Sequence, residues 1–137
     1  MDFLILIGRI LFVLLFLISA MRHFRQADAM TAYAQSRGVP SPRASVLATG
    51  VIMVVGALLV LLGLWADLGA LLLFLFLIGA AFFMHPFWKE SDQQTRQMES
   101  LHFYKDISLA GASLALFGLF VKFGDDVGLT LTGPLFG

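Results

Sequence analysis

The sequence predicts an all-α integral membrane protein, a four-helix bundle, and three observations support this fold class. Of the 137 residues, 59% are hydrophobic and 13% are charged, and the mean hydropathy is +0.89. Soluble domains are nearer to about half apolar and about a quarter charged. Four separate stretches are long and apolar enough to cross a bilayer core of about 30 Å. None of them alternates between apolar and polar residues, as a strand of a membrane barrel would.

The four expected spans cover residues 3–21, 46–64, 68–84 and 107–123. Only residues 65–67 separate the second span from the third, so we expect these two spans to form a tight helical hairpin. Residues 1–123 then form one four-span domain, and residues 124–137 are expected to be a loose tail. The acidic start of the chain and the length of its first apolar run are typical of an uncleaved span, not of a signal peptide.

The connectors after the first and third spans, residues 22–45 and 85–106, carry most of the positive charge. They hold seven of the nine Lys and Arg residues: Arg22, Arg25, Arg37, Arg43, Lys89, Arg96 and Lys105. The positive-inside rule therefore predicts that both connectors face the cytoplasm and that both termini lie outside.

The first connector contains a predicted short helix over residues 27–37. Tyr33 lies on its apolar side, Gly38 can terminate it, and Pro40 and Pro42 prevent it from resuming. We expect this helix to lie at the membrane interface beneath the bundle.

Several classes of function are excluded by what the chain lacks. There is no cysteine, so disulfide relays, thiol catalysis and cysteine-ligated metal centres cannot be built from this chain. No basic segment interleaved with aromatic residues is present, which argues against a nucleic-acid partner. Neither a nucleophile–base pair nor a phosphate-binding glycine loop is recognisable.

Arg9 is the one charged residue inside the first span. An arginine at the centre of an inserted helix costs roughly 2.5–3.5 kcal/mol. Its side chain can extend outward or bond a carbonyl and lock the bundle, or it can form a ligand site inside the bundle. The acids within reach are Asp2 and Asp67, and Asp125 or Asp126 if the tail folds back.

A second group of candidates lies at the connector edge of the spans, where all three histidines are found: His23, His85 and His102. Nearby side chains of interest are Arg22, Trp88, Tyr104, Lys105 and Asp106. Imidazoles can exchange protons with a quinone headgroup, ligate a metal or haem, or bond lipid headgroups and loop carbonyls. No pair of histidines has a tight ligand spacing such as His-x₃-His, so a metal or haem site is not expected. Hydrogen bonds to lipid headgroups or loop carbonyls are favoured over a quinone contact, and a quinone is the one cofactor that stays open.

Five segments, in order, resemble the DoxX family of small four-span bacterial membrane proteins. They are IGRILFVLLFLIS, GVPSP, GALLVLLGL, HPFW and FYKDISLAGASLALFG, within residues 4–119. The resemblance implies a location in the bacterial inner membrane and a fold similar to that of a subunit of an archaeal thiosulfate:quinone oxidoreductase. Some relatives are linked to membrane complexes of the oxidative-stress response.

Some positions match the family and others depart from it. Arg9, His85 and Lys105 match, and Arg22 stands where a lysine is usual. Relatives often have a glutamate where Met53 stands, a basic residue near Asp67 and an asparagine where Asp106 stands. Without a glutamate at position 53, the resemblance does not support a proton relay between an arginine and a glutamate here.

Three functions remain open from the sequence. The first is an accessory or quinone-contacting component of a membrane redox or oxidative-stress system. The second is a non-catalytic scaffold that binds a membrane or cytoplasmic protein through residues 85–106. The third is a carrier or binder of a small molecule or lipid with a site near Arg9. The bilayer is a partner in all three, and a homodimer is compatible with each.

Overall fold

The computed structural model describes residues 1–137 and is entirely helical outside its turns and connectors. Its five α-helices are α1 (Asp2–Arg25), α2 (Ala27–Ser36), α3 (Pro42–Leu62), α4 (Ala66–Met84) and α5 (Gln93–Phe123). Two short 3-10 turns, η1 (Phe87–Lys89) and η2 (Gly124–Asp126), precede and follow α5. Four of the helices, α1, α3, α4 and α5, are long and apolar enough to cross a membrane. The predicted fold class, a helical membrane bundle with four spans, is confirmed.

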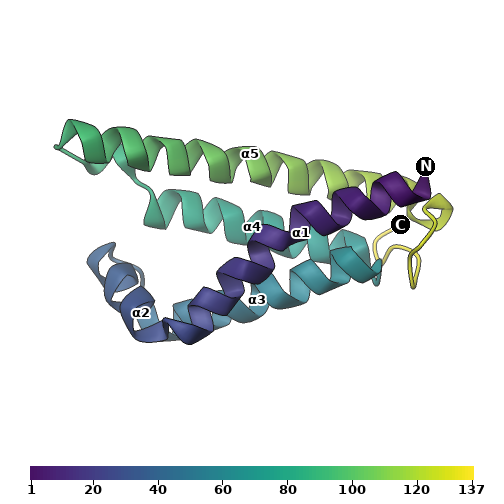
Figure 1. Cartoon of the computed structure of the whole chain (residues 1–137), viewed down its shortest axis with the longest axis horizontal. Coiled ribbons are helices and arrows are strands. Elements are labelled where there is room, and N and C mark those ends of the chain that lie inside the picture. Colours follow the sequence, from purple (N-terminus) through teal and green to yellow (C-terminus); the bar gives the residue numbers. More distant parts are fainter.

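The two ends of the bundle differ in what they contain (Figure 1). At one end lie the N-terminus, the turn between α3 and α4, and the C-terminal residues; we call this the terminal end. At the other end lie α2, η1 and the first turns of α5; we call this the connector end. Since each span runs from one end to the other, the two connectors that carry seven cations share the connector end.

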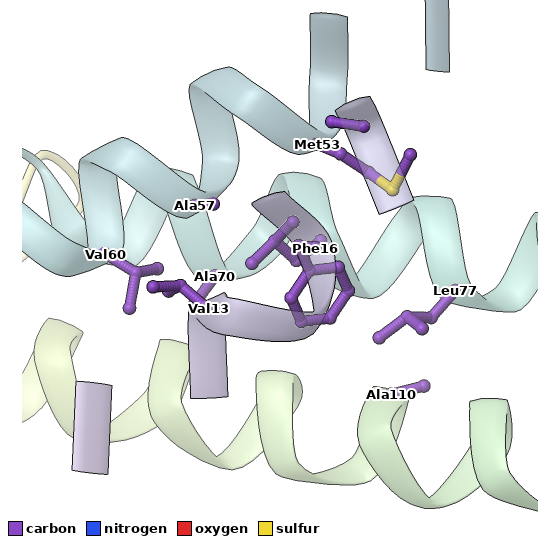
Figure 2. Packing of buried hydrophobic residues seen from close by; sticks show 10 residues of the cluster. Val13, Phe16, Met53, Ala57, Val60, Ala70, Leu77 and Ala110 are labelled. Atoms are coloured by element: carbon purple, nitrogen blue, oxygen red, sulfur yellow. The ribbon is translucent and has the colours of Figure 1, made fainter. Parts of the chain in front are cut away.

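The helices pack in the order α1 on α3, α3 on α4 and α4 on α5. Ten buried apolar residues from all four spans form one core (Figure 2): Val13, Phe16, Ala20, Met53, Ala57, Val60, Ala70, Leu73, Leu77 and Ala110. Within α1, α3 and α4 these residues recur every three or four positions, which places them on one face of each helix. The outer faces expose large apolar side chains such as Leu11 and Leu75, as expected of surfaces that contact lipid.

Small residues allow the closest helix contact. A Cβ atom added to Gly69 of α4 would lie 2.7 Å from the carbonyl oxygen of Gly56 in α3, so the two backbones touch. Gly63, at φ +64, ends α3 in the left-handed conformation that glycine adopts at little cost. The predicted tight hairpin between the second and third spans is therefore present.

The start of α5 differs from the prediction. The sequence predicts a span from residue 107 with a connector before it, whereas the helix that contains this span begins at Gln93 and includes most of the second connector. Asp92 caps it: its Oδ2 accepts hydrogen bonds from the Thr95 backbone N–H (2.8 Å) and hydroxyl (2.7 Å), which hold the pKa of Asp92 below its ordinary value. Hydropathy identifies only the apolar part of such a helix, so it does not predict the polar first turns.

The C-terminal residues also differ from the prediction, because they are not a loose tail. The backbone N–H groups of Leu131 and Thr132 each donate to the Gly63 carbonyl at 3.0 Å, and the Thr132 hydroxyl accepts from the Trp65 N–H at 2.9 Å. The end of α3 and the start of α4 leave carbonyl and N–H groups without helical partners. Residues 127–137, which we call the C-terminal segment, satisfy several of them.

The short helix expected in the first connector is observed as α2. It ends at Ser36, followed by the C-cap Arg37 and by Gly38 at a φ of +75, and it packs against α3. Its position at the membrane interface and the side of the membrane that each end faces stay predictions.

Candidate functional site

The imidazole of His85, just after α4, is the centre of a polar cluster at the connector end. Its Nδ1 lies 2.7 Å from Glu99 Oε2, and its Nε2 lies 3.7 Å from Asp106 Oδ2. The two acids are seven residues apart in α5, so they share one face of that helix. Both are buried, and the histidine ring is held between two carboxylates.

A second imidazole extends the cluster toward solvent. The ring of His102, also in α5, stacks on that of His85 with centroids 5.1 Å apart and an angle of 26° between the planes. Lys105 Nζ lies 3.5 Å from His102 Nδ1 and is exposed. Glu99, His102 and Asp106 follow the i, i+3, i+7 spacing of a single helix face.

Arg37 ties the cluster to α2. Its Nη1 lies 2.6 Å from Glu90 Oε1, and its Nη2 lies 3.3 Å from Glu99 Oε1 and donates to the Tyr33 hydroxyl at 3.1 Å. The bond to Glu90 raises the pKa of Arg37, with smaller contributions from Tyr33 and Glu99, so the guanidinium stays charged. One side chain therefore links α2, the connector after α4, and α5.

Aromatic rings lie beside the polar cluster. Phe87, Trp88, Phe103 and Tyr104 contact one another with centroids 5.3–5.8 Å apart. Trp88 and Tyr104 are 46% and 61% exposed. Aromatic side chains of this kind are typical of the boundary between hydrocarbon and headgroups.

Six of the eight predicted connector-edge residues come together here: His85, Trp88, His102, Tyr104, Lys105 and Asp106. The other two do not join them. Nδ1 of His23 donates to the Ser19 carbonyl at 2.8 Å within α1, and Arg22 is exposed and belongs to none of the ion pairs.

Sequence reasoning missed Glu99, Glu90 and the role of Arg37. The spacing of Glu99, His102 and Asp106 would have revealed their common face, but only if residues 93–106 had been taken as helix. The contacts of Arg37 join segments more than fifty residues apart, and no local pattern reports such a contact.

Arg9 and Asp67 lie at the opposite, terminal end. Arg9 is 2% exposed, and its Nη2 donates to the Leu129 carbonyl at 2.6 Å, so it does not extend outward. Asp67 is 0% exposed, and its Oδ2 accepts from the backbone N–H groups of Leu135 (2.8 Å) and Phe136 (2.7 Å). The two side chains form no ion pair with each other, and both are held by the C-terminal segment.

Met53, the third core candidate, lies inside the apolar core (Figure 2). Its thioether cannot exchange a proton, so this position contributes packing. No group of three or more His, Cys, Asp or Glu side chains in the structure has a geometry that could hold a metal ion.

The four apolar helices define a multi-pass helical membrane protein. A family model described as DoxX matches residues 4–86, which is more than half of the chain. The chain therefore belongs to the DoxX family. The matched range runs from α1 to the residues just after α4; it includes Arg9, Asp67 and His85 and ends before Glu99. Comparisons with curated proteins and with solved structures found no match.

We predict that Arg37→Ala loosens α2. The side chains of Arg37, Glu90 and Glu99 are 16%, 24% and 12% exposed. Loss of these charge-assisted bonds is expected to cost about 1–3 kcal/mol and to speed amide hydrogen exchange in α2. Exchange mass spectrometry and thermal unfolding of the purified protein measure both effects.

Arg43→Ala is the matched control, because the Arg43–Asp28 pair is 61% and 94% exposed. Exposed pairs contribute about 0–1 kcal/mol, so little change is expected. Equal exchange in α2 for wild type and Arg37→Ala, or an equal effect of both variants, would contradict the assigned role.

Proposed function

We propose that this protein is an accessory component of a membrane redox system and that a quinone headgroup contacts it at the connector end. The observation that carries the proposal is the imidazole of His85, held between Glu99 and Asp106 beside exposed aromatic rings. Membership of the DoxX family is compatible with a redox setting. Fold alone does not fix function, so the proposed role depends on the chemistry of these side chains.

Reduction of a quinone adds two electrons and two protons, one proton to each carbonyl oxygen. An imidazole gains and loses a proton near neutral pH, and a carboxylate bonded to one ring nitrogen fixes the tautomer and the ring orientation. In the proposed site His85 and His102 supply protons, and Glu99 and Asp106 orient His85 and return protons to it. The two electrons come from a partner oxidoreductase, because imidazole and carboxylate groups do not transfer electrons.

The surroundings suit such a headgroup. Trp88 and Tyr104 are exposed aromatic side chains, and a planar quinone can stack on such rings. Aromatic residues of this type lie at the level of the lipid headgroups, where a quinone ring can reach the protein from within the bilayer. By the positive-inside rule, we propose that this end faces the cytoplasm of a bacterial inner membrane, with both termini outside.

The two tryptophans allow a direct test, because Trp88 lies at the connector end and Trp65 at the terminal end. In a Trp65→Phe protein, a short-tailed ubiquinone analogue is expected to quench Trp88 fluorescence saturably. His85→Ala in that background is expected to weaken binding about fivefold to tenfold, the effect of one hydrogen bond of about 1–1.4 kcal/mol. Fluorescence titration in nanodiscs measures both.

Two controls define the result. His23→Ala removes an imidazole that takes no part in the cluster and is expected to bind normally. A Trp88→Phe protein, which retains only Trp65, is expected to show no saturable quenching. Equal saturable quenching of both tryptophans, or unchanged binding by His85→Ala, would refute the proposed quinone site.

A second function is favoured by the polar first turns of α5. Met98, Leu101 and Tyr104 are 54%, 69% and 61% exposed on one side of this helix and line a shallow hollow. Exposed apolar side chains along a helix face are typical of docking sites for an amphipathic helix. We propose, as the alternative, that the protein is a scaffold that binds a helical segment of a partner protein here.

A double variant, Met98→Ser with Leu101→Ser, tests the scaffold function. Proteins crosslinked to the wild type through this face should be lost from the double variant. They should be retained by the matched Gln94→Ser, Gln97→Ser variant, which changes polar residues lining the same hollow. Identical crosslinking patterns for all three proteins would contradict the scaffold function.

A further inference from the structure

Helix α2 is held to the rest of the protein by few buried contacts. Of its ten residues only Ala34 is buried, and a helix this short is not stable alone in water, so its position depends on what it contacts. It packs on α3, and Arg37, directly after its last residue, forms its ionic link to the connector after α4 and to α5. The other ion pair of α2, Asp28 with Arg43, is exposed and contributes little.

One carboxylate, that of Glu99, joins this link to His85. Its Oε1 lies 3.3 Å from Arg37 Nη2, and its Oε2 lies 2.7 Å from His85 Nδ1. The imidazole is 20% exposed and can exchange protons with water. A carboxylate oxygen only accepts hydrogen bonds, so Nδ1 of His85 carries a proton in this contact, and the other ring nitrogen, Nε2, is the atom that takes up a further proton.

The charged and titratable groups that surround His85 come from three parts of the chain. They are Glu99, His102 and Asp106 of α5, with Lys105 beside His102, and, through Glu99, Arg37 after α2 and Glu90 of the connector after α4. Nε2 of His85 lies 3.7 Å from Asp106 Oδ2, so a proton on Nε2 faces a carboxylate. The cluster therefore accommodates a positively charged imidazole.

A positive charge on His85 weakens the hold of Glu99 on Arg37. The imidazolium shares the single negative charge that Arg37 also uses, and it repels the guanidinium on the other side of the carboxylate. Arg37 keeps its bond to Glu90 at 2.6 Å, so the link is loosened and not broken. Such coupling is reciprocal: release of Arg37 from Glu99 favours the charged imidazole.

We propose that proton uptake by His85 loosens α2 through Glu99 and Arg37, so that the docking of α2 depends on the charge of the imidazole. Arg37 is then a positioning residue, which acts on His85 through the carboxylate between them. Non-helical residues flank α2, with Gln26 before it and Gly38 at a φ of +75 after it, and they allow the short helix to move as a unit. The inference goes beyond the proposed quinone contact, because it requires only that His85 gains a proton.

Hydrogen exchange mass spectrometry of the full chain in nanodiscs, with no quinone present, tests the proposal. The protein is compared at about pH 5.5 and about pH 8, on either side of the range in which an imidazole ordinarily titrates. After correction for the pH dependence of chemical exchange, peptides from α2 are expected to exchange about fivefold faster at the lower pH, the small end of coupling between sites. Peptides from α3 are expected to be unchanged. No difference in α2, or the same increase in α3, would overturn the proposal.

Variants assign the effect to the two residues that share Glu99. His85→Gln keeps a side-chain N–H donor but takes up no proton, so its α2 is expected to exchange equally at both pH values. Arg37→Gln is expected to exchange fast at both, whereas Arg37→Lys, which keeps the positive charge, is expected to regain part of the pH dependence. His23→Gln removes an imidazole outside the cluster and is expected to keep the fivefold change.

A full pH effect in His85→Gln or in Arg37→Gln would overturn the assigned coupling. If these variants do not fold, the comparison of α2 with α3 in the wild type still decides. The result is separate from the quinone titration: a protein that binds no quinone analogue but shows the pH effect would refute the proposed function alone.

Discussion

The lack of water around the middle of the four spans is the constraint on which the rest of this structure depends. Within hydrocarbon a backbone group must find its partner inside the protein, so the chain crosses as helices whose own hydrogen bonds satisfy it. Polar side chains are then confined to the two ends or to fully packed positions. Both groups of candidate residues, the His85 cluster and the buried Arg9 and Asp67, lie near the ends of the spans, where charged side chains are tolerated.

The two ends meet the constraint in different ways. At the connector end, opposite charges neutralise one another: Arg37, Glu99 and His85 join α2 to α5 in a network that remains partly open to solvent. At the terminal end, backbone groups of the C-terminal segment form hydrogen bonds with the charged side chains of Arg9 and Asp67. An open imidazole network is suited to exchanging protons, whereas the buried side chains at the terminal end hold the C-terminal segment in place.

The spans, the hairpin and the short helix could be predicted because each depends on residues that are close together in the sequence. These are the apolar runs and turn residues such as Gly38 and Gly63. It could not predict contacts that depend on distant segments meeting. The bond of Arg9 to Leu129 joins residues 120 positions apart. The sequence therefore does not decide whether the Arg9 side chain extends outward, locks the bundle through a carbonyl or forms a ligand site. Glu99 went unnoticed because its helix continues beyond the apolar run that marks the span.

The arrangement of the four spans requires hydrocarbon around their middle and water at the two ends, on opposite sides of the membrane. Since the chain has no cysteine, single cysteines introduced at Gln35, Leu75 and Asp126, all exposed, can be labelled with a membrane-impermeant maleimide in sealed vesicles. We expect labelling of position 126 from one side only, of position 35 from the other side only, and of position 75 from neither. Efficient labelling at position 75, or labelling of positions 35 and 126 from the same side, would contradict this arrangement.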